Sequence, residues 1–169
     1  MAQANQRPTV DAQAGAAALD DDLPRLLDLL GVGCIEELGW SRPNRLTLLV
    51  PMSGVHNGTK DDFLLRLGFQ AYRAWPPSAQ FVNPETLGFV MPDDQRFVPR
   101  LTSPECHTHP AYAKPGGGTV QLICCSATLE FYDVLHGVPP ELVWKGTETF
   151  LTTLTAIERA MASFYSGRF

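Results

Sequence analysis

The chain has 169 residues, of which 44% are hydrophobic and 18% charged, and its formal net charge is −5. This composition supports a folded core and differs from that of a disordered chain. The acidic balance argues against a nucleic-acid partner, which needs a basic face, and no apolar run approaches the roughly 20 residues of a membrane span. We therefore expect neither nucleic acid nor a membrane as a partner.

The cysteines and the N-terminal segment indicate the compartment. Cys124 and Cys125 are adjacent, and because adjacent cysteines rarely pair with each other, the four cysteines do not suggest a disulfide framework. Residues 1–20 contain one arginine and no hydrophobic block, so they do not resemble a secretory signal. The sequence therefore predicts a cytoplasmic protein with a flexible tail at 1–20 and one domain at 21–169.

The first half of the chain predicts a helix followed by strands. Residues 21–30 combine acidic capping residues, an early proline and an apolar stripe of leucines, which is typical of an amphipathic helix. Strands are predicted at residues 34–40, 45–50, 63–70 and 79–83. The last of these follows Pro76-Pro77, which suits an extended entry to an edge strand. Together the four strands predict an antiparallel meander.

The second half predicts a long loop and then helices. Residues 84–119 hold six prolines and a run of three glycines, and a loop of this length is usually functional or an insertion. A short apolar run at 120–123 leads into Cys124, and residues 128–135 are predicted as a short helix. A final helix is indicated by an apolar stripe, formed by Phe150, Leu154, Ile157, Met161 and Phe164. This order of elements predicts an α+β fold.

Three blocks of the sequence occur in an order found in a known family. Residues 63–81 read FLLRLGFQAYRAWPPSAQF, residues 122–125 read LICC, and residues 144–157 read WKGTETFLTTLTAI. They resemble, in turn, the third strand with its Pro-Pro segment, the surroundings of the catalytic cysteine, and the tryptophan with its following helix in ubiquitin-conjugating (E2) enzymes. The resemblance extends over roughly residues 20–165. It implies a UBC-like fold and a divergent, bacterial E2-like member.

The resemblance also implies a reaction and its partners. E2 enzymes accept a ubiquitin-like protein from an E1-like activating enzyme as a thioester, and they transfer it to an amine such as a lysine of a protein acceptor. These three proteins are the expected partners, and no cofactor is expected. The nucleophile implied is Cys124, because it follows Ile123 as the family's cysteine follows an aliphatic residue. Cys125 is the second choice. Adjacent side chains of a strand point to opposite faces, so only one of the two can face the cleft.

The His-Pro-Asn motif of the family is incomplete in this chain. Its nearest match is His109-Pro110-Ala111, which has alanine where the family has the asparagine assigned to the oxyanion. We expect His107 or His109 to replace it, as a neutral donor to the oxyanion or as a base for the amine. Asp133 is a weaker candidate for orienting the amine. The alternatives are a structural or solvated role for the histidines and a solvated helix acid at Asp133.

The sequence allows three further interpretations. Zinc prefers the ligand types of Cys106, His107, His109 and Cys124, but their spacing is too tight for the usual closed sites, and no metal is predicted. The missing asparagine favours a catalytically inactive scaffold of the same fold, although inactive variants generally lose the cysteine. A Cys/His hydrolase using Cys124 ranks third, because no acid that would orient the histidine is evident.

Overall fold

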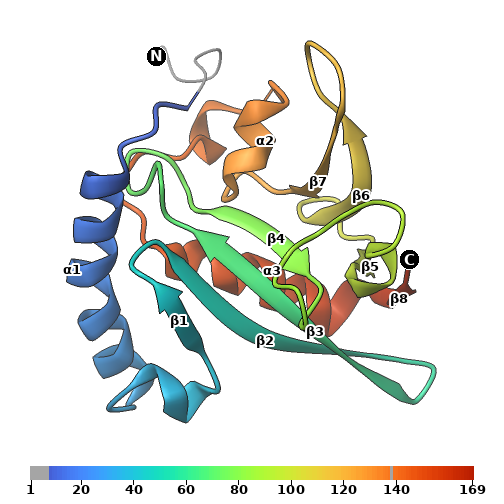
Figure 1. Ribbon diagram of the computed structural model, residues 1–169, viewed down its shortest axis with the longest axis horizontal. Coiled ribbons are helices and arrows are strands. Elements are labelled where there is room, and N and C mark those ends of the chain that lie inside the picture. The colour runs from blue at the N-terminus through green and yellow to red at the C-terminus, as the bar shows by residue number, and fades with distance from the viewer. Residues whose placement is uncertain (1–7, 138) are drawn as a thin grey trace.

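The computed structural model describes residues 8–137 and 139–169 (Figure 1). Its helices are α1 (Ala12–Leu30), α2 (Leu129–Asp133) and α3 (Phe150–Phe164), and its 3-10 helices are η2 (Ile35–Leu38), η3 (Gln95–Phe97) and η4 (Pro140–Leu142). Its strands are β1 (Ser41–Asn44), β2 (Thr47–His56), β3 (Thr59–Gly68), β4 (Ser78–Val82), β5 (Pro99–Leu101), β6 (His107–Ala113), β7 (Thr119–Cys124) and β8 (Tyr165–Arg168). Within these ranges no helix is both long and apolar enough to cross a bilayer.

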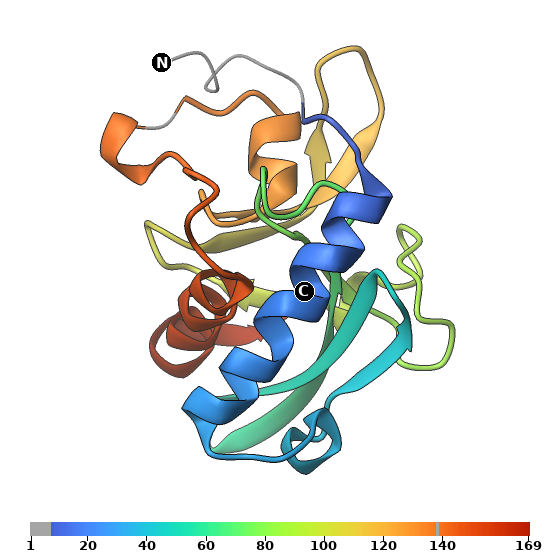
Figure 2. The same cartoon turned by 90° about the vertical axis from the view of Figure 1, so that its left-hand side faces the viewer.

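The central sheet is an antiparallel meander in the order β1-β2-β3-β4. β2 and β3 pair along their whole length, and a two-residue turn at Asn57-Gly58 joins them. Both turn residues have positive φ (52° and 78°), which matches the twist of a tight hairpin. Figures 1 and 2 show α1 along the β1 side of the sheet and α3 across one of its faces.

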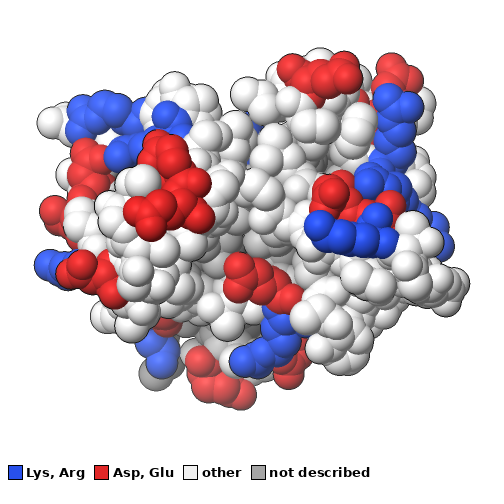
Figure 3. All heavy atoms as spheres, turned by 90° about the horizontal axis from the view of Figure 1, so that it is seen from below, with Lys and Arg blue, Asp and Glu red and all other residues white. Residues whose placement is uncertain are grey.

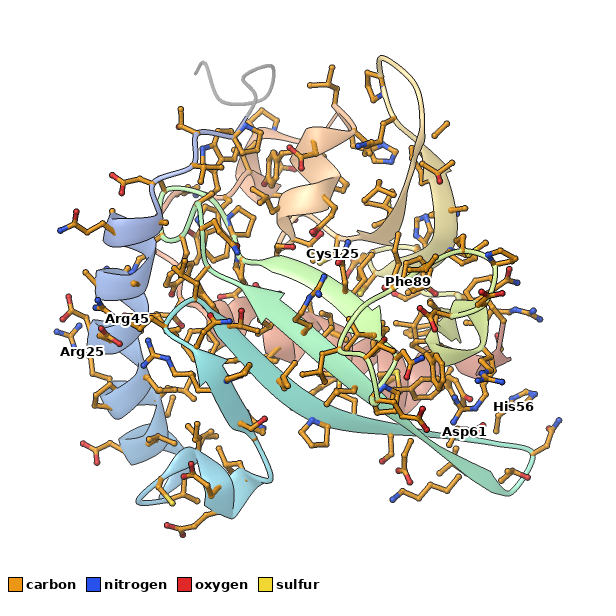
Figure 4. All side chains as sticks on the ribbon, viewed as in Figure 1. Arg25, Arg45, His56, Asp61, Phe89 and Cys125 are labelled. Atoms are coloured by element: carbon orange, nitrogen blue, oxygen red, sulfur yellow. The ribbon has the colours of Figure 1, made fainter. Side chains whose placement is uncertain are left out.

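Two smaller strand pairs complete the architecture, β6 with β7 and β5 with β8. Gln121 of β7 fixes the β6–β7 hairpin beside the central sheet: its side-chain amide accepts from the Phe81 N–H at 2.7 Å and donates to the Phe81 carbonyl at 2.9 Å. β8 is held to the far end of β3, where Asp61 accepts from the Tyr165 hydroxyl at 2.7 Å and from Arg168 at 2.8 Å. Figure 4 labels Asp61 at this end, near His56.

One hydrophobic core joins α1, the sheet, the hairpin and α3. Its most deeply buried side chains come from all of these elements and include Leu19, Leu48, Leu65, Phe81, Ile123, Leu154 and Ile157. Burying a side chain of this size contributes roughly 1.5–3 kcal/mol. The hairpin that carries Cys124 is therefore packed into the same core as the sheet.

Charged side chains lie in small mixed groups on the surface. In the view from below, basic and acidic residues stand side by side (Figure 3). Asp20 of α1, for example, pairs with Arg42 at 2.6 Å and with Arg45 at 3.1 Å. Exposed pairs of this kind add little to stability.

The structure confirms an α+β fold with an N-terminal helix, a four-stranded antiparallel sheet and a C-terminal helix. It corrects the start of the first helix, because α1 begins at Ala12 and residues 12–20, predicted as part of the tail, are helical. Asp11 caps this helix, since its carboxylate accepts from the Ala14 N–H at 3.0 Å. Residues 1–7 of the predicted tail lie outside the described residues.

Two other predictions were wrong. The strand predicted at 34–40 is the 3-10 helix η2, which ends at Gly39 with a left-handed φ of 71°, and the first strand follows it. The loop predicted at 84–119 contains η3, β5 and β6. β6 tolerates Pro110 because its pairing with β7 is irregular between His109 and Tyr112.

Candidate functional site

A pocket of about 370 Å³ lies where the end of β7 meets α2 and α3. Three of the four cysteines line it, together with Phe131 of α2 and, among other residues, Thr152, Ala156 and Arg159 of α3. Figure 4 labels Cys125 between α2 and β4. The pocket therefore brings thiols from two separate segments to one place.

The pairing of β6 with β7 brings the predicted nucleophile next to a predicted histidine. Cys124, the last residue of β7, lies opposite His107, the first residue of β6. Residues directly opposite in an antiparallel pair have Cβ atoms about 4.5–5.5 Å apart, on the same face. His109 follows on that face, and its ring contacts the His107 ring edge-on, with the centroids 5.0 Å apart. Cys124, His107 and His109 thus form one cluster.

The two adjacent cysteines have different surroundings. Cys124 is half-buried, and its pKa is raised by burial and then by the negative charge of Cys125. Cys125 is buried, yet its pKa is lowered, mainly because the Cys106 thiol donates a hydrogen bond to its sulfur, with the Ala127 N–H adding to the effect. The pKa of Cys106 is raised by the same bond and by burial. Solvent access thus favours Cys124 as the nucleophile, whereas the lowered pKa favours formation of the thiolate at Cys125.

The surroundings of His109 favour its neutral form. Its pKa is lowered by burial and by the nearby charges of His107 and His136. A neutral imidazole carries one donor and one acceptor nitrogen, so it can donate to an oxyanion or accept a proton. The ring also packs on Tyr112, which contacts His136, and His136 stacks on Phe131 of α2.

The histidines and Asp133 do not form the wall of the pocket. Among the residues described as lining it, neither His107, His109 nor Asp133 is present. Asp133 is exposed at the end of α2, where its charge helps to raise the pKa of Glu130. The structure therefore groups the histidines with Cys124 on the hairpin and places Asp133 with Glu130.

The zinc interpretation finds no support in the geometry. Across residues 8–137 and 139–169, no group of three or more His, Cys, Asp or Glu side chains is arranged to hold a metal ion. Cys106 instead contacts Cys125. This contact went unpredicted, because it depends on a strand in a segment that the sequence marks as a loop. Arg159 on the pocket wall was likewise not predicted. The sequence indicates it only through its spacing on α3, since it follows Thr152 by seven residues and so lies on the same helix face.

Comparison with known proteins adds no family to this description. No protein-family model, no curated protein and no solved structure matches the chain. The fold and the cluster of thiols and imidazoles are therefore the basis for a functional proposal.

Proposed function

We propose that this chain is an E2-like conjugating enzyme of UBC-like fold, which carries a ubiquitin-like protein as a thioester on Cys124 and transfers it to an amine. The observation that carries the proposal is the position of Cys124, half-exposed at the end of β7 and opposite His107. A thiol that receives an acyl group from another protein must be reachable. Cys125, with 6% of its surface exposed, meets this requirement less well.

The contacts among the three E2-like sequence blocks support the proposal. Gln121, next to the cysteine block, binds the backbone of Phe81 at the end of the first block. The Trp144 indole of the third block donates to the Arg73 carbonyl of the first block at 2.8 Å. The blocks are therefore neighbours in space, as parts of one catalytic fold would be.

In the first step the Cys124 sulfur attacks the thioester carbonyl of the charged E1-like enzyme. A new S–C bond forms, the S–C bond of the donor breaks, and the proton of the Cys124 thiol passes to the departing thiolate. Burial and the charge of Cys125 raise the pKa of Cys124, so this thiol is protonated at neutral pH and releases its proton during the attack.

In the second step an amine attacks the Cys124 thioester. The carbonyl oxygen becomes an oxyanion, and Cys124 leaves as a thiolate that takes up the proton lost by the amine. The neutral ring of His109, beside His107, supplies either an N–H for the oxyanion or a nitrogen for the amine proton. One of these histidines would then perform the role of the absent asparagine.

A thioester assay tests the proposal directly. The protein is mixed with ATP and the E1-like and ubiquitin-like proteins encoded nearest to it, and a reductant-sensitive adduct is measured. We expect the adduct in the wild type and in Cys125→Ser, and its loss in Cys124→Ser, with Cys34→Ser as the matched control at an exposed cysteine outside the pocket. No adduct, with E1 charging demonstrated, would contradict the proposal and favour the inactive scaffold.

The histidines are tested in the discharge of the preformed adduct to free lysine. We expect His107→Ala or His109→Ala to slow this step by on the order of 10²-fold, because general acid–base groups contribute about 10²–10⁴-fold. Unchanged discharge in both variants would exclude them from the reaction.

A Cys/His hydrolase is the other enzymatic candidate, and the position of His107 opposite Cys124 favours it. A hydrolase releases the acyl group to water. Its discharge would therefore be as fast without lysine as with it, whereas a conjugating enzyme depends on the amine concentration.

A further inference from the structure

Cys106 and Cys125 lie at corresponding positions just beyond the paired part of the β6–β7 hairpin. The pairs Thr108–Ile123 and His107–Cys124 are the last two of the ladder at this end. Continuing the same register by one residue sets Cys106 opposite Cys125. Opposed residues of antiparallel strands have Cα atoms about 4.5–5.5 Å apart, within the roughly 4.4–6.8 Å that a disulfide spans.

The two thiols also interact directly. Each of the two groups lies close enough to shift the pKa of the other. Both side chains are buried, with 3% and 6% of their surface exposed, and both line the 370 Å³ pocket. A small molecule in this pocket would therefore lie beside both cysteines.

Cys124 is less suited to pair with Cys106 than its neighbour is. It belongs to the next position of the ladder, opposite His107, and successive side chains of a strand point to opposite faces. The register thus separates the roles of the two adjacent cysteines.

We propose that Cys106 and Cys125 are a redox-active dithiol, which a small hydroperoxide entering the pocket converts into a cross-strand disulfide. This assignment does not depend on the conjugating activity. It gives the second cysteine of the Cys124-Cys125 pair a partner other than an acyl group.

The chemistry balances with hydrogen peroxide as the oxidant. The Cys125 sulfur attacks one peroxide oxygen, an S–O bond forms, the O–O bond breaks, and the departing hydroxide takes a proton and leaves as water. The Cys106 sulfur then attacks the Cys125 sulfenic acid, an S–S bond forms, the S–O bond breaks, and a second water leaves. Two thiols are oxidised by two electrons in total, and one peroxide is reduced to two waters.

Oxidation would alter the neighbouring Cys124 as well. The charge of Cys125 contributes to the raised pKa of Cys124, and a disulfide carries no such charge. The reduced and oxidised forms should therefore differ in the rate at which iodoacetamide alkylates Cys124, with the oxidised form reacting faster at neutral pH.

The test uses the full chain in a Cys34→Ser background, because Cys34 is exposed and could link two molecules. The reduced protein is treated with hydrogen peroxide and denatured, and its free thiols are alkylated and counted by intact mass. We expect one free thiol instead of three after oxidation, and a mass lower by two hydrogens before alkylation. Chymotrypsin, which cuts after Tyr112 and Leu122, should yield a peptide with Cys106 linked to the Cys124-Cys125 segment.

Matched variants identify the pair. Cys124→Ser should still form the disulfide, whereas Cys106→Ser and Cys125→Ser should not, and Cys106→Ala provides a second variant if serine disturbs the buried site. Circular dichroism of each variant establishes that it is folded.

Two results would overturn the proposal. One is three free thiols in the treated protein when the same peroxide dose oxidises a small thiol added to it. The other is a disulfide that persists in folded Cys125→Ser, which would assign the bond to Cys124. Because neither result involves an acyl donor, the outcome is separate from that of the thioester assay.

Discussion

Asp22 of α1 and Glu130 of α2 are both buried carboxyl groups, with 4% and 5% of their surface exposed, but their surroundings differ. Asp22 accepts two hydrogen bonds from the Arg73 guanidinium, at 2.6 and 3.0 Å, and one from the Tyr72 hydroxyl. Glu130 accepts from the Ser78 hydroxyl and from the Ala79 N–H, both neutral donors. Only the carboxyl on α1 faces a cation.

This difference separates a carboxyl group paired with a cation from one that is bound by neutral donors. The Tyr72 hydroxyl also accepts from the Phe150 N–H at 3.0 Å, so the Asp22 network connects α1, the turn after β3 and the start of α3. On the α2 side, burial raises the pKa of Glu130 to about 7. Glu130 therefore changes its charge near neutral pH, whereas Asp22 forms an ion pair with Arg73.

The largest effect is expected from Asp22→Asn. This change leaves the Arg73 guanidinium without its carboxylate and should lower the free energy of unfolding by about 3 kcal/mol, the lower end of the effect of breaking a buried ion pair, because the Arg73 side chain keeps 32% of its surface exposed. Urea denaturation measures it. The matched control is Asp20→Asn on the same helix, whose ion pairs are exposed, and its effect should be much smaller. Equal effects would show that the Asp22 network is not a stabilising connection.

Glu130→Gln should change how stability depends on pH. The folded protein holds the Glu130 proton up to a pKa of about 7, while the unfolded chain releases it near the ordinary glutamate pKa of 4.5. Folding therefore retains a proton between these values, and this contribution is complete below about pH 4.5 and is lost as the pH rises through 7.

The size of this loss is roughly 3 kcal/mol, since each pKa unit corresponds to about 1.4 kcal/mol. The glutamine variant keeps an acceptor for the Ala79 N–H and offers an amide N–H to the Ser78 oxygen, and it carries no titratable proton, so its stability should fall less over the same range. Urea midpoints at several pH values from 4 to 8 measure both proteins. Parallel curves would mean that the Glu130 proton is not retained on folding.

The sequence predicts the helices and the sheet well where a pattern is long. Phe150, Leu154, Ile157 and Met161 form the expected stripe and are buried in α3, whereas Phe164, the fifth predicted member at the end of the helix, is 41% exposed. The alternation of β3 is likewise confirmed. Both patterns extend over several turns or residue pairs, so burial of one face determines the element.

Short segments were predicted poorly, because local hydrogen bonds decide them. Ile35–Leu38 has strand-like composition around it, yet it folds as a 3-10 helix whose end is fixed by Gly39 and by a bond from the Trp40 N–H to the Ile35 carbonyl. β6 has no continuous apolar alternation, and its partner strand defines it. Tertiary pairing outweighs propensity in such cases.

The candidate site depends on such a short segment, the strand β6. The sequence singles out Cys124, His107 and His109 by residue type, but their adjacency follows from the register of a hairpin that was expected to be a loop. The same register sets Cys106 opposite Cys125. A shift by one residue would separate all of these side chains, so residue types alone could not predict the cluster.

A smaller loss of stability is expected where a neutral hydrogen bond joins α3 to the segment after Cys125. The buried Thr153 hydroxyl of α3 donates to the Ala127 carbonyl at 2.7 Å, two residues after Cys125. Thr153→Val leaves that carbonyl unpaired and should cost about 1–3 kcal/mol of stability. Thr155→Val, at an exposed position of the same helix, is the matched control. A loss of stability as large as that of Asp22→Asn would contradict the contrast between the ion pair of Asp22 and the neutral hydrogen bonds near the cysteines.

The smallest effect concerns the charge state of His109. Burial is the main reason that its pKa is lowered, and the charges of His107 and His136 add to this effect. His107→Gln should therefore raise the pKa of His109 only part of the way toward its ordinary value, because the burial remains. An NMR titration of the imidazole signals measures this pKa, and His56→Gln at the far end of β2 should leave it unchanged. Complete restoration in His107→Gln would show that charge, not burial, lowers the pKa of His109. Even at its ordinary pKa of about 6.5 the ring is mostly neutral above pH 7, so the donor role at neutral and alkaline pH depends on the position of the ring on the same face as Cys124 and not on this shift.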